Sequence, residues 1–306
     1  MKLAYCGDLH ITNRKPKNRI DNYFETVLGK VNQIYQIANE ENCEVVIQPG
    51  DFFDSYKESH LVVQEIINIL KKYPKICTFV VAGQHDMQFH NSDLSGTTLG
   101  TLLTHTDLIT LLNKTPCCSN DHTAFYGASW NEEIPEIITP DCVNILVLHK
   151  MVVDKKLWVE QEGHTWANHL LLKTDFDLIV SGDNHKQFFA KQENRHLINI
   201  GSMMRSTIDQ IDHCPAVAIY DTELKHYDVI DLEIKPFDEV MQLEKAEKEK
   251  EKNLQLESFI HSLKDKEVKE GQTIKLSFVE RINQYCIENK VDQSIQDIIK
   301  DCLNES

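Results

Sequence analysis

Short apolar runs recur along the first part of the chain, each bounded by polar or glycine-containing residues. They are rich in β-branched and aromatic side chains, a composition typical of buried strands. The pattern predicts β-strands at Leu3–Cys6, Glu44–Gln48, Cys77–Ala82, Thr123–Tyr126, Asn144–Leu148 and Leu178–Ser181.

Between the early strands the apolar residues follow a helical period. They repeat at three and four residues from Ile20 to Ile37 and again from Val62 to Leu70. A strand, then a helix, then a strand is the order that produces parallel strands covered by helices. The chain up to about residue 185 is therefore predicted to be an α/β domain.

After about residue 196 the pattern changes to strands without helices between them. The segments "HLINIGS", "PAVAIYD" and "HYDVIDLEI" each read as a strand, and "DTEL" between the last two reads as a hairpin turn. We expect an antiparallel sheet to follow the mixed one.

A further change in composition occurs near Pro236. Residues 244–253, "EKAEKEKEKN", are nearly all Glu and Lys and indicate a solvated helix or a flexible link. A strand is expected at 273–278 and an amphipathic helix at 291–302. We therefore predict two domains, 1–235 and a small C-terminal α+β domain at 236–306. The apolar stripe of the last helix can pack within that domain or dock a partner.

Composition narrows the class of protein. Of the 306 residues, 41% are hydrophobic and 26% are charged, as in soluble globular proteins. No apolar run approaches the roughly 20 residues of a membrane span, and an acidic residue comes too early for a secretory leader. The nine cysteines show no CxxC spacing. This usage predicts reduced thiols and a cytoplasmic location.

The formal net charge of −16 argues against a basic protein that coats nucleic acid without specificity. It leaves open an enzyme that acts on nucleic acid. Clustered carboxylates that hold cations lower the formal charge without repelling a phosphate once the metal is bound.

Candidate chemistry appears where the predicted strands end. In open α/β sheets the carboxyl ends of the strands share one edge, where ligands bind. Five strands are followed at that end by residues with carboxylate, imidazole or amide side chains. The segments are "GDLH", "PGDFFD", "GQHD", "NILVLH" and "GDNH". The candidate metal ligands are Asp8, His10, Asp51, Gln84, His149, Asp183 and His185.

One Asp after a strand is commonly a turn residue or a helix cap. The same event at five strand ends indicates a shared site instead. The set contains no thiolate, and its mixture of carboxylate, imidazole and amide oxygen suits manganese, iron or zinc. Seven ligands are too many for one ion and suit two, the usual apparatus for attack on a phosphoester.

These ordered motifs resemble the calcineurin-like metallophosphoesterase superfamily. Within it, "GDFFDS", "NIGSMMRS" and the spacing of the motifs are most similar to SbcD-type DNA nuclease subunits, particularly compact phage versions. The resemblance covers about residues 1–235. It implies a four-layer α/β/β/α sandwich of two mixed sheets with a small C-terminal cap, in a bacterial or phage-infected cytosol.

The resemblance also implies roles for individual residues. Asp8, His10 and His185 would hold one ion, Asp51 would bridge, and Gln84, His149 and Asp183 would hold the other. His85 would steer or protonate the leaving oxygen, and Asp86 would orient His85.

Two positions depart from the family pattern, and both belong to the same ion. Gln84 replaces an asparagine, and Asp183 replaces the first histidine of the last motif. Each keeps a donor for a hard cation, and the added carboxylate favours manganese or magnesium over softer ions.

Basic residues near the motifs are candidates for contact with phosphate. Four of them follow the first motif and one follows the last motif: Arg14, Lys15, Lys17, Arg19 and Arg205. The loop that holds the first four is equally compatible with ordinary solvated charges. The resemblance implies DNA, a coiled-coil SbcC-type ABC ATPase and a second copy of the chain as partners, and no membrane.

The sequence thus predicts a two-metal DNA exonuclease of repair, recombination or replication, with endonuclease activity as a second expectation. Two alternatives stay open. One is a phosphatase or small-molecule phosphodiesterase with the same fold, since a fold alone does not choose the substrate. The other is a catalytically weak subunit that binds DNA ends or the ATPase, suggested by Gln84 and Asp183.

Overall fold

A computed structural model describes residues 1–119, 122–157, 163–207, 210–242 and 296. The chain divides into two compact units, Met1–Met241 and Gln242–Ser306. The predicted Glu/Lys link, the strand at 273–278 and nearly all of the final helix lie outside the described residues. At the predicted boundary, helix α5 (Phe237–Val240) still belongs to the first unit, where the backbone N–H of Ile20 donates to the Val240 carbonyl at 3.0 Å.

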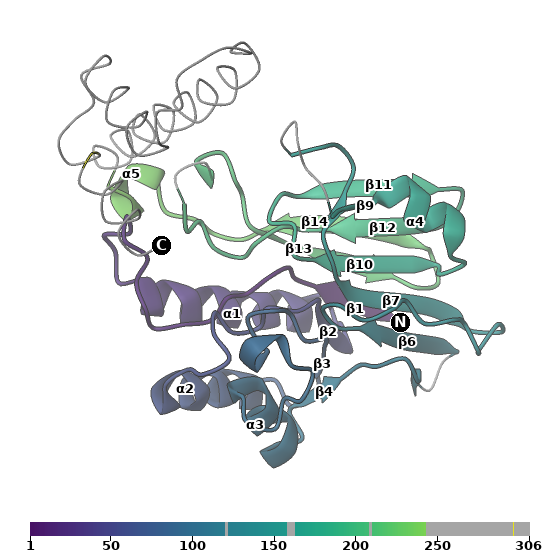
Figure 1. Cartoon of the computed structure of the whole chain (residues 1–306), viewed down its shortest axis with the longest axis horizontal. Coiled ribbons are helices and arrows are strands. Elements are labelled where there is room, and N and C mark those ends of the chain that lie inside the picture. The colour runs from purple at the N-terminus through teal and green to yellow at the C-terminus, as the bar shows by residue number, and fades with distance from the viewer. Residues whose placement is uncertain (120–121, 158–162, 208–209, 243–295, 297–306) are drawn as a thin grey trace, which may run out of the picture. The chain divides into compact units, whose positions relative to one another are not determined.

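The first unit is built on two mixed six-stranded sheets (Figure 1). The first sheet runs in the order β14 (His226–Asp231), β13 (Ala216–Asp221), β1 (Lys2–Tyr5), β2 (Val45–Gln48), β3 (Cys77–Val80), β4 (Ile109–Leu111). The second runs in the order β11 (Phe188–Gln192), β12 (Arg195–Asn199), β10 (Leu178–Gly182), β7 (Val143–His149), β6 (Thr123–Ala128), β5 (Cys117–Ser119).

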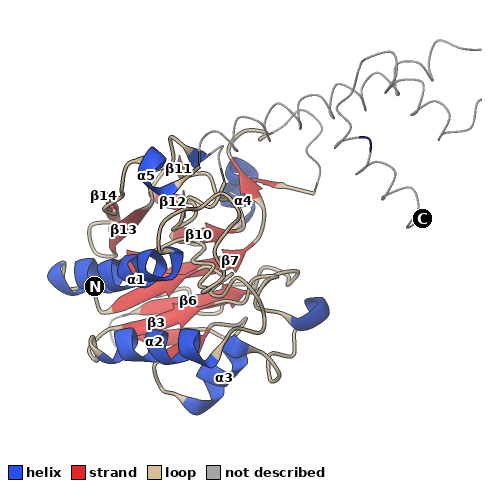
Figure 2. Cartoon of the chain, turned by 90° about the vertical axis from the view of Figure 1, so that its left-hand side faces the viewer, coloured by secondary structure: helices blue, strands red, loops and turns tan. Residues whose placement is uncertain are grey.

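Helices cover the outer faces of both sheets (Figures 1 and 2). On the first sheet lie α1 (Tyr23–Glu40), α2 (His60–Lys71) and α3 (Thr98–His105), and on the second lies α4 (Ala167–Lys173). Smaller elements are the pair β8 (Val152–Val153) and β9 (Thr165–Trp166), and the 3₁₀ turn η1 (Gln88–His90). The predicted four-layer α/β/β/α sandwich is confirmed.

The alternation of side chains along each strand creates the layers. In β1, Leu3 and Tyr5 point into the core between the sheets, whereas Ala4 points toward the helices. Val45 and Ile47 of β2 also point into the core between the sheets. Because both faces of these strands are buried, the sequence shows continuous apolar runs in place of strict alternation.

Local sequence signals set where two of the helices begin. The Ser59 hydroxyl accepts from the backbone N–H of Val62 at 3.4 Å at the start of α2. The Thr97 hydroxyl accepts from the N–H of Gly100 at 3.0 Å at the start of α3. Each satisfies one of the backbone donors that a helix start leaves free.

The predicted separate antiparallel sheet is wrong. β13 and β14 do form an antiparallel hairpin, but β13 pairs with β1 and so extends the first sheet. β12 instead pairs in parallel with β10 in the second sheet. The cause is a crossover between the sheets after β12, which the strand pattern alone does not reveal.

The cysteines of the described residues are free thiols, as predicted. Within the same part of the chain, no helix combines the length and apolar character that crossing a membrane requires.

Candidate metal centre

Polar side chains gather where β1, β2, β3, β7 and β10 end. β1, β2 and β3 are parallel neighbours in the first sheet, and β7 and β10 are parallel neighbours in the second. Their carboxyl ends therefore share an edge within each sheet. The structure brings together at this edge all seven predicted ligands, Asp8, His10, Asp51, Gln84, His149, Asp183 and His185.

The first group consists of Asp8, His10 and His185, whose ligand atoms all lie within 4.8 Å of one another. The Nε2 atoms of His10 and His185 are 3.1 Å apart. The His185 Nε2 is 3.4 Å from Asp8 Oδ2. Two imidazoles and a carboxylate thus converge on one point, as the ligands of one cation do.

The second group continues from the first through Asp51. Asp51 Oδ2 lies 3.4 Å from His149 Nε2 and 3.7 Å from His10 Nε2. The His149 Nε2 donates to the Gln84 side-chain oxygen at 2.8 Å, and the Gln84 amide donates to Asp183 Oδ1 at 3.0 Å. Asp51 therefore stands between the two groups, where a bridging carboxylate would be.

The backbone at this edge is strained. Asp51 and Asp183 have φ values of 52° and 76°, in the left-handed region that is unfavourable for residues other than glycine. Such strain persists where the surrounding structure enforces it, most often at functional sites. Close packing also requires glycine at position 83, because a Cβ on Gly83 would lie 2.0 Å from Asp51 Oδ1.

The electrostatics of the centre follow from burial and from the mixture of charges. Burial raises the pKa of Asp8 to about 7. Burial opposes the charge of His149, but the adjacent carboxylate of Asp51 prevails and raises the pKa of His149 to about 10. Burial likewise opposes the charge of Asp51, yet His149 holds the pKa of Asp51 at about 2. Burial and the charge of His10 lower the pKa of His185 to about 4.

The side chains fit divalent ions. Asp8 Oδ1 and Asp51 Oδ2 are buried, and neither accepts a hydrogen bond within the described residues. A buried carboxylate oxygen that accepts no hydrogen bond is costly unless a cation lies against it. Oxygen and imidazole ligands without thiolate match a hard or borderline cation. Asp8, His10 and His185 would hold one ion, Asp51 would bridge, and Gln84, His149 and Asp183 would hold a second.

His85 lies beside the centre and is exposed, with its ring nitrogen within 4.8 Å of ligand atoms of His10 and Asp51. Its backbone N–H donates to Asp51 Oδ1 at 2.9 Å. Its Nδ1 lies 2.8 Å from the backbone carbonyl oxygen of Asp54, so this carbonyl orients the ring.

The predicted orienting role of Asp86 is therefore corrected. The Asp86 carboxylate is fully buried and accepts from the backbone N–H groups of Phe52, Phe53 and Gly83 at 3.0–3.1 Å. It ties the loop after β2 to the loop after β3. Asp86 thus positions the segment that contains Asp51, and its oxygens are already occupied by backbone donors.

Two supporting groups were not assigned a role from the sequence. The carbonyl of Pro49 accepts from His149 Nδ1 at 2.7 Å, which fixes Nε2 as the nitrogen that faces the centre. The carboxylate of Asp54 lies 3.5 Å from His10 Nδ1. The segment "GDFFD" places Asp54 just after the second strand, so its position near the centre could be predicted from the sequence. The role of a backbone carbonyl could not, because it does not depend on residue type.

The basic residues divide into two sets. Arg14, Lys15 and Lys17 are exposed, and an Arg14 guanidinium nitrogen lies 3.6 Å from Asp54 Oδ2, next to the centre. Arg19 and Arg205 are only 4% and 6% exposed.

Contact of Arg19 and Arg205 with a bound phosphate was predicted and is corrected by this burial. The Arg19 guanidinium binds Asp21 at 2.6 and 2.8 Å and donates to the Arg205 carbonyl at 2.7 Å. The Arg205 guanidinium donates to the Lys235 carbonyl and lies 5.4 Å from the Phe237 ring centre. Both side chains secure the C-terminal part of the first unit.

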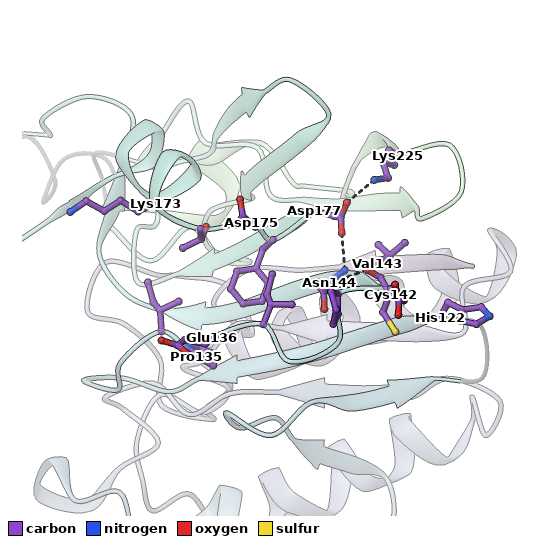
Figure 3. Close-up of a pocket in the computed structure, with 16 residues that line it drawn as sticks. His122, Pro135, Glu136, Cys142, Val143, Asn144, Lys173, Asp175, Asp177 and Lys225 are labelled. Carbon is purple, nitrogen blue, oxygen red and sulfur yellow. Dashed lines mark hydrogen bonds and ion pairs between the residues drawn. The ribbon is translucent and has the colours of Figure 1, made fainter.

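A cavity of about 950 Å³ lies at the other end of the second sheet (Figure 3). Its lining includes Asn144 at the start of β7 and Asp177 just before β10. Lys225 pairs with Asp177 at 2.6 Å, and the backbone N–H of Asn144 donates to Asp177 at 2.9 Å. None of the predicted metal ligands lines it, so this cavity is separate from the metal centre.

Solved structures with a similar chain path are distant in sequence. A protein of Thermus thermophilus is 12% identical, with 75% of this chain and 98% of that chain covered and a TM-score of 0.49. An archaeal phosphodiesterase is 18% identical, with 76% and 100% covered and a TM-score of 0.43. A dimetal phosphatase from Danio rerio is 11% identical, with 72% and 91% covered and a TM-score of 0.47. A search of curated protein sequences gave no match.

The family assignment comes from a sequence model. Residues 1–187 match the model described as calcineurin-like phosphoesterase. This match begins before Asp8 and ends after His185, so it contains every residue of the metal centre described above. The chain belongs to the calcineurin-like phosphoesterase family of metal-dependent hydrolases.

Proposed function

We propose that the protein is a two-metal DNA nuclease that hydrolyses phosphodiester bonds, as an exonuclease and in some contexts an endonuclease. The observation that carries the proposal is the convergence of Asp8, Asp51, His149 and His185 from separate strands at one edge. Manganese is the proposed ion because carboxylate and amide oxygens outnumber imidazoles at the Gln84–His149–Asp183 position.

The centre is open to a large substrate. The His185 side chain is 45% exposed, and His85 is also exposed. A polymer can therefore approach the ligands without entering an enclosed pocket. Arg14 adds a cation whose side chain is 59% exposed, which pairs with Glu58 at 2.7 Å and lies 3.6 Å from Asp54. A cation at this position suits the phosphate next to the one that is cleaved.

The chain's own residues have distinct tasks in such a reaction. Bound divalent ions would supply Lewis-acid activation of the phosphoryl group and of water. Asp51 holds the two halves of the centre at a fixed separation through its contacts with His10 and His149. The Nδ1 hydrogen of His85 is donated to the Asp54 carbonyl, so the imidazolium form of His85 carries its second proton on Nε2 and can give that proton to the departing sugar oxygen.

The experiment compares substrates under one set of conditions. End-labelled linear duplex DNA, p-nitrophenyl phosphate and a cyclic nucleotide are each incubated with the protein and manganese, with EDTA as the control. The proposal expects labelled nucleotides or short oligonucleotides from DNA. Turnover of the small esters alone would identify a phosphatase or small-molecule phosphodiesterase instead.

A second candidate function is a subunit that binds DNA ends or a partner and has little activity of its own. The hydrogen bond from Gln84 to Asp183 favours this function. These are the two positions that depart from the family pattern, and each side chain is engaged by the other. Gln84→Asn tests this candidate. If the wild-type protein is silent and the variant is active, the binding role is favoured.

The proposed setting is DNA repair, recombination or replication, with a coiled-coil SbcC-type ABC ATPase and a second copy of the chain as partners. It is supported by the sequence resemblance of "GDFFDS" and "NIGSMMRS" to SbcD-type subunits. Co-purification of the full chain with a candidate ATPase, and its mass in solution, test the two partners separately.

A further inference from the structure

Phe89 is a large apolar residue that the fold holds in water. It is 85% exposed, although nearby Met87 is only 5% exposed. Phe89 and His90 both have positive φ values, 50° and 58°. Two consecutive non-glycine residues in the left-handed region are unusual, and such backbone strain is concentrated at functional sites.

The surroundings of Phe89 fix this arrangement. Before it, the buried Met87 side chain anchors the chain, and the Met87 N–H donates to the Gln84 carbonyl at 3.3 Å. After it, the His90 ring lies 4.8 Å from the Trp130 ring. The Trp130 N–H donates to the Ala82 carbonyl at 2.8 Å, at the end of the strand that leads into the centre. Phe89 therefore projects from a turn that is fastened on both sides.

The turn adjoins the reactive part of the site. Phe89 follows His85 by four residues, and Tyr56 follows Asp54 by two. The 2.8 Å contact between His85 Nδ1 and the Asp54 carbonyl joins these two loops. The rings of Tyr56 and Phe89 lie 6.2 Å apart with an interplanar angle of 43°. The two aromatic rings thus come from the two loops that the His85–Asp54 contact joins.

We propose that Phe89, with Tyr56 beside it, is a stacking platform for the nucleobase next to the scissile phosphate. This inference rests on the proposed nuclease function and specifies the substrate class as nucleoside phosphodiesters. An exposed aromatic face stacks on any base, so it gives affinity without sequence preference. It also explains why the fold keeps an apolar ring exposed next to a strongly polar centre.

The test uses two esters with the same leaving group. Thymidine 5′-(p-nitrophenyl phosphate) and methyl p-nitrophenyl phosphate differ only in the nucleoside. Phe89→Ala should raise KM for the thymidine ester by roughly 5- to 150-fold, the range that loss of one base–aromatic stack gives. The kcat for that ester and both constants for the methyl ester should stay unchanged. Phe89→Tyr should restore the wild-type KM.

Leu224→Ala is the matched control, because Leu224 is 75% exposed and lies in the turn between β13 and β14. It should leave both esters unaffected. An equal effect of Phe89→Ala on the two esters would overturn the inference and assign Phe89 to the shape of the site. No effect on either ester would also overturn it.

A binding measurement separates failure of this inference from failure of the proposed function. Fluorescently labelled oligothymidine is titrated with the wild-type, Phe89→Ala and Leu224→Ala proteins in calcium, and its anisotropy is followed. The inference expects weaker binding only for Phe89→Ala. The nuclease proposal fails if the wild-type protein releases nothing from duplex DNA, whereas unchanged binding by Phe89→Ala rejects the platform alone.

Discussion

The Nδ1 nitrogen of His85 lies 2.8 Å from the backbone carbonyl oxygen of Asp54. A carbonyl oxygen only accepts, so Nδ1 carries the hydrogen and Nε2 is the nitrogen left for chemistry. The orientation is imposed by backbone, which no side-chain substitution removes directly. Replacing His85 removes this one contact, but the loop that holds Asp51 keeps its ties to the Asp86 carboxylate and to the backbone N–H of residue 85.

His85→Ala should lower kcat/KM for a phosphodiester by about 100- to 10,000-fold, the usual contribution of a general acid. Bound metal should stay at the wild-type level, since the other ligands remain. Atomic emission spectroscopy of the dialysed protein measures the metal, with the exposed His226→Ala as the control. Loss of one ion would place His85 among the ligands, a role that its distance from His10 and Asp51 also permits.

Asp51→Asn should abolish binding of both ions and all turnover, because the bridging carboxylate is lost. The metal-free variant should also lose about 3 kcal/mol of unfolding free energy, since His149 would be left as a buried charge without its partner. Calorimetric titration with manganese and urea unfolding measure the two effects. Asp175→Asn, at a side chain that is 96% exposed, is the matched control. Retained activity in Asp51→Asn would contradict the bridge.

Gly83→Ala and Gly29→Ala should act in opposite directions. The new methyl group at Gly83 would lie 2.0 Å from Asp51 Oδ1, so metal binding should fail and stability should fall. At Gly29 nothing lies within 4 Å, and alanine in the middle of α1 should stabilise the protein by about 0.5–1 kcal/mol. Thermal unfolding and metal content are measured for both. Normal metal binding by Gly83→Ala would contradict this prediction and show that the loop after β3 can move to accommodate the methyl group.

The pair His149–Asp51 should give metal-stripped protein a distinctive pH profile. The raised pKa of His149 contributes stability that is fully present below 6.5 and is lost as pH rises through about 10. The lowered pKa of Asp51 contributes stability that is present above 3.8 and is lost as pH falls through about 2. The pair therefore stabilises most between pH 3.8 and 6.5. Urea unfolding of the EDTA-treated wild-type and His149→Gln proteins, from below pH 3.8 to about pH 10, should show a difference in stability that is largest inside this window and falls on both sides.

Metal binding at His149 should show the opposite pH preference. A ligand imidazole must be neutral at the coordinating nitrogen, so the proton on Nε2 has to leave. The affinity for manganese should then rise about tenfold per pH unit from neutrality toward pH 10, the pKa of His149. Titration at several pH values measures the slope. A flat profile would mean that His149 is not a ligand.

The convergence of the candidate metal ligands could be predicted because each follows an apolar run that ends at the same edge. Asp8, Asp51, His149 and His185 all show this signal, which depends only on strand direction. Arg19 could not be placed in the same way. A basic residue in a polar loop reads as exposed, and only the folded structure shows that Asp21, two residues on, neutralises it in the interior.

Strand pairing was the other feature beyond the sequence pattern. The apolar run in β13 fits any sheet, and nothing in it specifies β1 as the neighbour. The same holds for backbone acceptors, since the Pro49 and Asp54 carbonyls that orient His149 and His85 have no residue type to signal them. Side-chain identity predicts chemistry, whereas backbone geometry decides which ring nitrogen performs it.

The pairing of β1 with β13 has a consequence for synthesis of the chain. The strand that delivers Asp8 stays without one of its two neighbours until residues 216–221 have left the ribosome. Contacts between residues so far apart in sequence form late, because the entropic cost of closing a long loop comes before the stabilisation that the contacts provide. A nascent chain that already contains every candidate ligand is thus still unable to complete the edge that positions them. Translation itself delays the appearance of a competent enzyme until the whole first unit has been made.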